Sequence, residues 1–182
     1  SLCLVVCFWA AAHHGGRPEA TREEKPLWLV GEGSDLPWQS CVADSYTRSF
    51  ASLLRNPFQA EVLARWYRAA AQDTPWQQPD VRGGGRLPRK AAWFVRGGCS
   101  CSYSYNGTSW PAVDMPPWLL EIEAAVWQLL GSHADGCPPP RPNSCVLNLY
   151  LDGSQAVDWH ADDEDLFQGL ACDSLIVGLS LG

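Results

Sequence analysis

From residue 145 to its last residue, the chain is a series of short apolar runs separated by turn residues. Cys145–Leu151 and Leu175–Leu181 each predict a strand, Ala156–His160 predicts another between them, and Asp152-Gly153 supplies a turn. Because Leu175–Leu181 is almost wholly apolar, we expect it to be buried. Short strands that follow helices in the chain predict an α+β fold in which helices buttress a β-sandwich or jelly roll.

Two upstream segments have the apolar spacing of helices. Asn56 is a favourable N-cap and Pro57 a favourable first residue, so the first helix is predicted to begin there. Its apolar stripe, expected to pack on the sheet, consists of Phe58, Val62, Trp66 and Ala70. Pro116-Pro117 is predicted to begin the second helix, and Gly131 is a suitable residue after its last turn. The two strands predicted between these helices are Ala91–Val95 and Cys101–Tyr105.

Charge is distributed unevenly along the chain. The net charge of -7 argues weakly against a nucleic-acid binder. However, residues 81–113 carry five Lys or Arg and no acid, whereas residues 151–182 carry seven acids and no Lys or Arg. A basic segment beside an acidic one suits a metal site that faces a phosphate backbone. Two solvated loops are the other interpretation.

Cysteine spacing argues against a disulfide scaffold. The eight Cys are irregularly spaced in a chain that is too long for a small disulfide framework. Cys99 and Cys101 form a C-x-C pair, but no second Cys or His pair lies at zinc spacing. We therefore predict reduced thiols.

The N-terminal region predicts little regular structure. Leu2–Ala12 is apolar but too short to span a bilayer, and it fits either the end of a signal peptide or a truncated leader. Residues 13–40 are rich in Gly, Pro and charge, which is typical of a poorly ordered arm. We therefore predict a leader and arm over residues 1–54 and a folded domain over residues 55–182.

The candidate chemistry lies near the end of the chain. His160 and Asp162 are two residues apart, so in an extended segment their side chains face the same way. An imidazole and a carboxylate on one face supply two ligands of a 2-His-1-carboxylate iron site. Alone the pair is weak evidence, but the strand that precedes it carries two polar residues, Asn148 and Tyr150.

Several ordered blocks resemble the AlkB-like Fe(II)/2-oxoglutarate dioxygenases, in the eukaryotic branch that repairs alkylated DNA or RNA. The most specific blocks are N-x-Y-x-D-G, which begins at Asn148, D-W-H-x-D-D-E, which ends at Glu164, and the final strand, which ends in S-L-G. Similarity is weak in Phe58–Gln78, and further similar blocks are Pro88–Phe94, Tyr103–Gly107 and Trp110–Gly131. The resemblance covers roughly residues 55–182 and implies a double-stranded β-helix, or jelly roll.

The resemblance also implies roles for individual residues. His160 and Asp162 match iron ligands, and Asn148 and Tyr150 match residues that bind the carboxylates of 2-oxoglutarate. The implied nucleic-acid side of the site comprises Arg89, Tyr103 and Tyr105 on the lid, and Asp163 and Glu164 against the damaged base. The implied cofactor is Fe(II), with 2-oxoglutarate and O₂ as co-substrates.

The residues themselves leave simpler interpretations open. Tyr103 and Tyr105 also suit ordinary strand packing, and Asn148 and Tyr150 suit a buried strand with satisfied polar groups. The acidic pair Asp163-Glu164 also suits a solvated turn, and the basic pair Arg89-Lys90 a solvent-exposed surface.

The chain departs from the family pattern at its end. The family's distal His and its 2-oxoglutarate Arg are expected several tens of residues after Gly182. We therefore expect a C-terminally truncated domain that is unstable and nearly inactive alone. The implied function is oxidative demethylation of N-alkylated bases in DNA or RNA, by a monomer without a membrane partner, in the nucleus. The alternatives are an inactive binding protein and, if the apolar leader is a targeting segment, the cytoplasm or an organelle.

Overall fold

The computed structural model describes residues 3–9, 35–46, 49–81, 83–105, 107–130, 141–158, 160, 162, 166 and 175–182. Its helices are α1 (Ala60–Asp73) and α2 (Pro117–Leu129). Its strands are β1 (Cys3–Trp9), β2 (Gln39–Asp44), β3 (Ser49–Leu53), β4 (Lys90–Val95), β5 (Tyr103–Tyr105), β6 (Thr108–Trp110), β7 (Val113–Asp114), β8 (Ser144–Tyr150) and β9 (Ile176–Leu181). Neither helix is long and apolar enough to cross a membrane.

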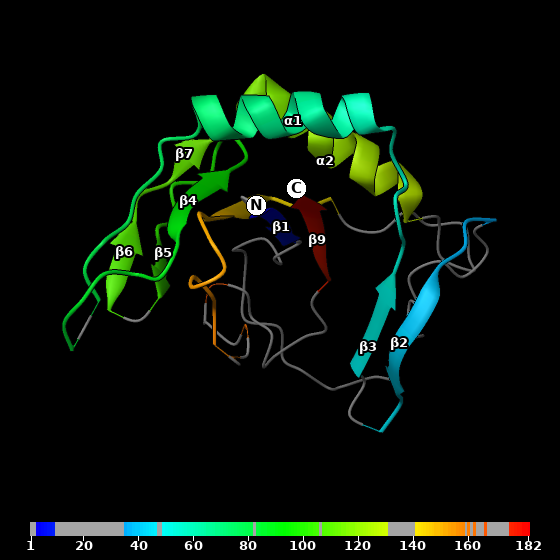
Figure 1. Cartoon of the computed structure of the whole chain (residues 1–182), viewed down its shortest axis with the longest axis horizontal. Coiled ribbons are helices and arrows are strands. Elements are labelled where there is room, and N and C mark those ends of the chain that lie inside the picture. Colours follow the sequence, from blue (N-terminus) through cyan, green and yellow to red (C-terminus); the bar gives the residue numbers. More distant parts are fainter. Residues whose placement is uncertain are drawn as a thin grey trace.

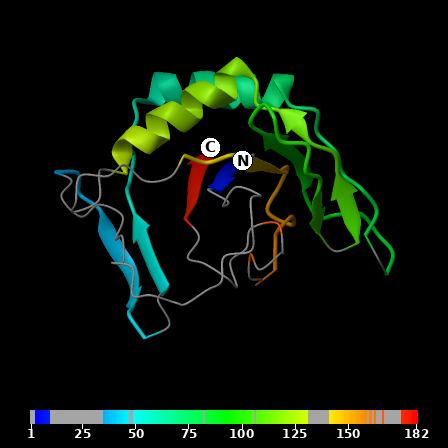
Figure 2. The ribbon, with the colours of Figure 1, turned by 180° about the vertical axis from the view of Figure 1, so that it is seen from behind.

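A five-stranded sheet with the order β7-β4-β8-β1-β9 forms the centre of the molecule. Its neighbouring strands are antiparallel except β4 and β7, which are parallel. Both helices cover one face of this sheet (Figure 1). The β2–β3 and β5–β6 pairs form separate two-stranded sheets that flank the central sheet on opposite sides (Figure 2).

The main core lies between the central sheet and the helices. Alternate residues of each strand face the helices, and in the central strands these residues are buried and mostly apolar. The predicted stripe of α1 is confirmed, because Trp66 and Ala70 are buried and Phe58 and Val62 pack against the same core. A second cluster on the other face packs the sheet against the β5–β6 hairpin.

The first helix begins later than predicted. Asn56 is not the N-cap; its φ of 48° places it in the left-handed region before the helix. Gln59 precedes the first turn, and its carbonyl accepts hydrogen bonds from the backbone N–H groups of Val62 and Leu63. The second helix begins at Pro117 as predicted, whereas Gly131 lies outside the described residues.

The predicted strands 91–95 and 145–151 are confirmed, and so is most of 101–105. The strand predicted over Ala156–His160 is wrong, because residues 156–158 and 160 have no strand pairing. Residues 176–181 of the predicted strand form β9, but this strand is only partly buried. It ends the sheet, so Ile176 is 41% exposed while Leu181 faces the core.

The N-terminal apolar run has a place in the fold that the sequence did not predict. Cys3–Trp9 is not an isolated leader but β1, paired along its length between β8 and β9. Leu4, Val6 and Phe8 are completely buried against the helices. Residues 39–44 and 49–53 also form strands, within the region predicted as a poorly ordered arm.

One pair of cysteines corrects the prediction of reduced thiols. Cys99 and Cys101 form a disulfide in the turn that follows β4. The backbone N–H of Cys99 bonds the carbonyl of Arg96, and Trp93 donates its Nε1–H to the carbonyl of Cys101. Cys3, Cys7, Cys41 and Cys145 are free thiols, as predicted, whereas Cys137 and Cys172 lie outside the described residues.

Candidate active site

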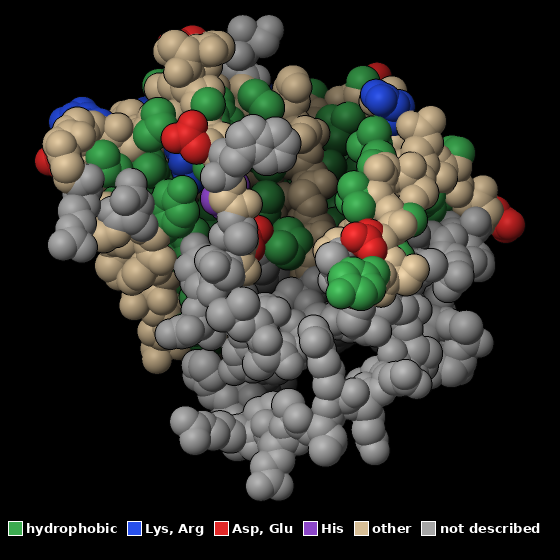
Figure 3. All heavy atoms as spheres, turned by 90° about the horizontal axis from the view of Figure 1, so that it is seen from below, with side chains coloured by type: hydrophobic (Ala, Val, Ile, Leu, Met, Phe, Trp, Pro, Cys, Tyr) green, Lys and Arg blue, Asp and Glu red, His purple; other side chains and the backbone are tan. Residues whose placement is uncertain are grey.

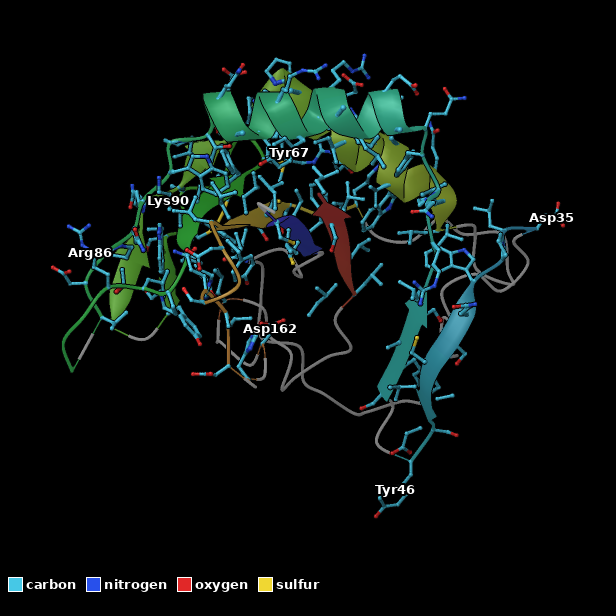
Figure 4. The ribbon with its side chains drawn as sticks, viewed as in Figure 1. Asp35, Tyr46, Tyr67, Arg86, Lys90 and Asp162 are labelled. Carbon is cyan, nitrogen blue, oxygen red and sulfur yellow. A yellow bond between two sulfur atoms is a disulfide. The ribbon has the colours of Figure 1, made fainter. Side chains whose placement is uncertain are left out.

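The candidate residues lie on the face of the sheet that is turned away from the helices. On β8, Leu147 and Leu149 face the helical core, so the alternate residues Asn148 and Tyr150 point to the opposite side. Figure 4 shows Asp162 on this opposite side of the sheet from Tyr67 of α1. A groove of about 580 Å³ between β3, the end of α2 and β9 is a separate feature that no candidate residue lines.

His160 and Asp162 lie side by side, although the strand from which their common orientation was predicted is not present in residues 156–158 and 160. His160 Nε2 lies 3.4 Å from Asp162 Oδ1, with the two side chains 37% and 26% exposed. His160 Nδ1 lies 2.7 Å from the carbonyl oxygen of Asp158. Because a carbonyl only accepts, this contact places the proton of a neutral imidazole on Nδ1 and leaves the Nε2 lone pair toward Asp162.

This arrangement fits a metal ion. A neutral imidazole nitrogen and a carboxylate oxygen are both acceptors, so they lie close together only when a proton or a cation sits between them. Two ligands each about 2.1 Å from one metal ion lie roughly 3 Å apart at a right angle. The hydrogen bond at Nδ1 fixes the imidazole as metal ligands require. Within the described part of the chain, no third His, Cys, Asp or Glu completes a ligand group.

Arg89 lies inside the site instead of on an exposed nucleic-acid surface. It is 7% exposed, and its Nε donates a hydrogen bond of 2.7 Å to Oδ1 of Asn148. Burial raises the pKa of Tyr150, an effect that the Arg89 charge partly offsets. The Tyr150 phenol therefore stays protonated at neutral pH and can donate a hydrogen bond.

The two lid tyrosines have different environments. Tyr103 stacks on Trp93 and on Trp110, with ring centroids 5.2 and 5.6 Å apart, so it packs within the hairpin side of the core. Tyr105 instead lies under the Arg89 guanidinium, whose carbon is 5.5 Å from the centroid of the Tyr105 ring. The centroids of the Tyr105 and His160 rings are 6.3 Å apart. Of the two, Tyr105 is brought to the His160–Asp162 pair. Figure 3, which shows the molecule from below, has a purple histidine side chain on the face opposite the helices.

The described cations of the basic segment 81–113 have different environments. Arg89 is buried, and Arg96 is paired with Glu123. Arg86 remains 74% exposed beside Asp80, and it points outward near the β5–β6 hairpin (Figure 4). Asp163 and Glu164, predicted to meet the base, lie outside the described residues.

Cys7 is a site residue that sequence reasoning missed. It lies on the same face of the sheet as Asn148, and a Cβ on Gly178 of the neighbouring strand would lie 3.9 Å from its sulfur. Burial and, to a smaller extent, the Asp162 carboxylate raise the pKa of Cys7 to about 11. No local signal indicates this position, because it depends on the pairing of β1 with strands far along the chain.

Cys7 is therefore expected to react slowly with thiol reagents. With a pKa of about 11, roughly 0.1% of this thiol is ionised at pH 8, and only the thiolate is nucleophilic. Site-resolved mass spectrometry after iodoacetamide treatment of the metal-free protein is expected to show Cys7 modified at least about tenfold more slowly than the exposed Cys41. Equal rates would contradict the placement of β1 in the sheet.

Two comparisons with known proteins agree with this geometry. The chain is similar to the DNA oxidative demethylase ALKBH2 of Arabidopsis thaliana, with 38% identity over 98 residues. That match covers 51% of this chain and 29% of the Arabidopsis protein. The family model for the 2OG-Fe(II) oxygenase superfamily matches residues 50–182. The resemblance to AlkB-like dioxygenases is thereby confirmed, and the chain belongs to the 2OG-Fe(II) oxygenase superfamily.

Proposed function

We propose that this chain contributes to the Fe(II)/2-oxoglutarate-dependent oxidative demethylation of N-alkylated bases in DNA or RNA. The observation that carries the proposal is the His160–Asp162 pair, with facing donor atoms 3.4 Å apart, beside the Arg89, Tyr105 and Asn148 cluster. The central sheet would then be one sheet of a jelly roll, with the helices on its outer face.

Different side chains of the site would contact the metal, the co-substrate and the base. His160 and Asp162 would hold Fe(II), which activates O₂ when 2-oxoglutarate is bound. Asn148 and the protonated Tyr150 would donate hydrogen bonds to the co-substrate carboxylates. Oxidation of an N-methyl group, followed by loss of formaldehyde, restores the unmodified base.

The base side of the proposal rests on fewer described residues. A base inside a duplex must be flipped out of the stack before a buried metal can reach it. Tyr105, beside His160, is the aromatic side chain placed to contact it, whereas Tyr103 is stacked between two Trp rings. We retain Asp163 and Glu164 as proposed acceptors for the exocyclic amino group, and Arg86 as a phosphate contact. The similarity to a DNA oxidative demethylase favours alkylated DNA and the nucleus.

A second proposal is that the chain binds alkylated nucleic acid without turning it over. It is favoured by one observation, that the described residues supply two metal ligands and not three. The two proposals differ in metal-dependent 2-oxoglutarate binding, which only the dioxygenase requires.

Metal binding tests the primary proposal directly. The chain is expected to bind Mn²⁺, used as a redox-inert stand-in for Fe(II), and then 2-oxoglutarate, both measured by titration calorimetry. His160→Ala and Asp162→Ala are each expected to weaken Mn²⁺ binding by at least about 100-fold, because each removes a ligand outright. Asp152→Ala, an exposed carboxylate in the preceding turn, is the matched control and should leave affinity unchanged. Equal Mn²⁺ binding by all four proteins would rule out this site.

A further inference from the structure

Arg89 is a buried cation without a described counter-charge. Among the described residues, Arg89 and Glu123 are the charged side chains that are buried. Glu123 is neutralised by two arginines, Arg96 and Arg141. No described carboxylate pairs with Arg89, and the partners it does contact are an amide oxygen and an aromatic ring. Because burying a guanidinium costs free energy of hydration, the position of Arg89 beside the candidate site indicates a specific role there.

The contact with Asn148 determines which way that amide points. An Asn side chain has an acceptor oxygen at one end and an NH₂ donor at the other. A guanidinium carries only donors, so the amide end that faces Arg89 Nε at 2.7 Å must be the oxygen. The reverse orientation would place two donors against each other. The Nδ2 donor of Asn148 is therefore turned away from Arg89 and remains available to a ligand.

The Arg89 side chain is itself held in place by two contacts. It precedes β4, whose pairing with β8 sets Ala91 opposite Asn148, so Arg89 is on the same face as the amide. Its guanidinium also lies over the Tyr105 ring, an interaction that an arginine makes better than a lysine. The hydrogen bond and the ring contact together hold one guanidinium orientation.

We propose that Arg89 is a positioning residue that locks the Asn148 amide with its NH₂ group toward a carboxylate of 2-oxoglutarate. The inference rests on the proposed function and adds a residue that acts through Asn148. Without Arg89, the amide can rotate and present its oxygen to the carboxylate, where two acceptors repel each other.

A double-mutant cycle tests whether Arg89 acts through Asn148. The affinity for 2-oxoglutarate is measured calorimetrically in the presence of Mn²⁺ for the wild type, Arg89→Met, Asn148→Ala and the double variant. Arg89→Met is expected to weaken binding by about tenfold when Asn148 is present and by less than about twofold when it is Ala. Lys90→Met is the matched control: it neighbours Arg89, its side chain is directed to the other face of the sheet, and its affinity should equal that of the wild type.

Each possible result of this cycle either supports or contradicts the proposed role of Arg89. Equal losses from Arg89→Met in both backgrounds would overturn the proposal and indicate that the guanidinium contacts the ligand itself, and no loss in either background would overturn it as well. No 2-oxoglutarate binding by the wild type would overturn the proposed function, and this inference with it. If Arg89→Met fails to fold, Arg89→Lys replaces it in the same cycle. Lys keeps the charge but lacks the fixed fork geometry of Arg. We therefore expect Arg89→Lys to weaken 2-oxoglutarate binding only when Asn148 is present, and by less than Arg89→Met does.

Discussion

Replacing Glu123 with Ala is expected to lower the free energy of unfolding by about 2–3 kcal/mol. Glu123 is 1% exposed on α2, and its two carboxylate oxygens bind different arginines. Arg96 Nη2 lies 2.6 Å from Oε2, and Arg141 Nη1 lies 2.8 Å from Oε1. The truncation removes both hydrogen bonds that this carboxylate accepts and leaves a cavity beneath the helix, while the two arginine side chains, which are 40% and 59% exposed, regain hydration.

Glu61 provides the control on the other helix. It is an exposed carboxylate in the first turn of α1. Because an exposed charge at a helix N-terminus contributes little, Glu61→Ala is expected to cost less than about 1 kcal/mol. Urea unfolding of the wild type and both variants measures the difference. Similar losses for the two substitutions would contradict the burial of Glu123.

The effect of Glu123 should extend to the candidate site. Arg96 follows β4, and its Nε also donates to the carbonyl of Pro142 just before β8. Its backbone N–H bonds the carbonyl of Asn143. The ion pairs therefore attach the paired ends of β4 and β8 to α2. The same pairing sets Arg89 beside Asn148, so a stable β4–β8 register is a condition for the site.

Local patterns were sufficient for the helices and for the strands β4 and β8. The Pro residues before α2 and the apolar stripe of α1 act within a few residues, so the sequence reveals them directly. Even there, the start of α1 depended on the left-handed backbone of Asn56, which a propensity argument does not predict. The closeness of His160 and Asp162 follows from their sequence separation of two, but it occurs without the strand on which the prediction rested.

The features that the sequence did not reveal depend on pairing between strands that are distant in the chain. Arg89 sits in a basic stretch and looks exposed, and only the β4–β8 register shows that it is buried beside Asn148. Tyr103 and Tyr105 share the spacing of one strand face, yet the packing of Trp93 and Trp110 separates their roles. β1 is the extreme case, because its partners lie more than a hundred residues away in the chain.

Replacing Val6 with Asp is expected to destabilise the protein by about 4 kcal/mol or more. Val6 is completely buried in the middle of β1, packed toward the helices between β8 and β9. An ionised carboxylate there loses its hydration without gaining a described partner, and the burial of the Val side chain is lost as well. Thermal unfolding followed by circular dichroism measures the change.

Val42→Asp makes the same substitution in β2, where the side chain is 47% exposed. Its expected cost is below about 1 kcal/mol, because the new charge remains hydrated. The comparison separates the two interpretations of the N-terminal run. A leader that lies outside the domain would make both substitutions equally mild, whereas a central strand makes only Val6→Asp severe. A severe effect at Val6 would also support the placement of Val5 and Cys7 on the alternate face of the same strand, the face that carries Asn148.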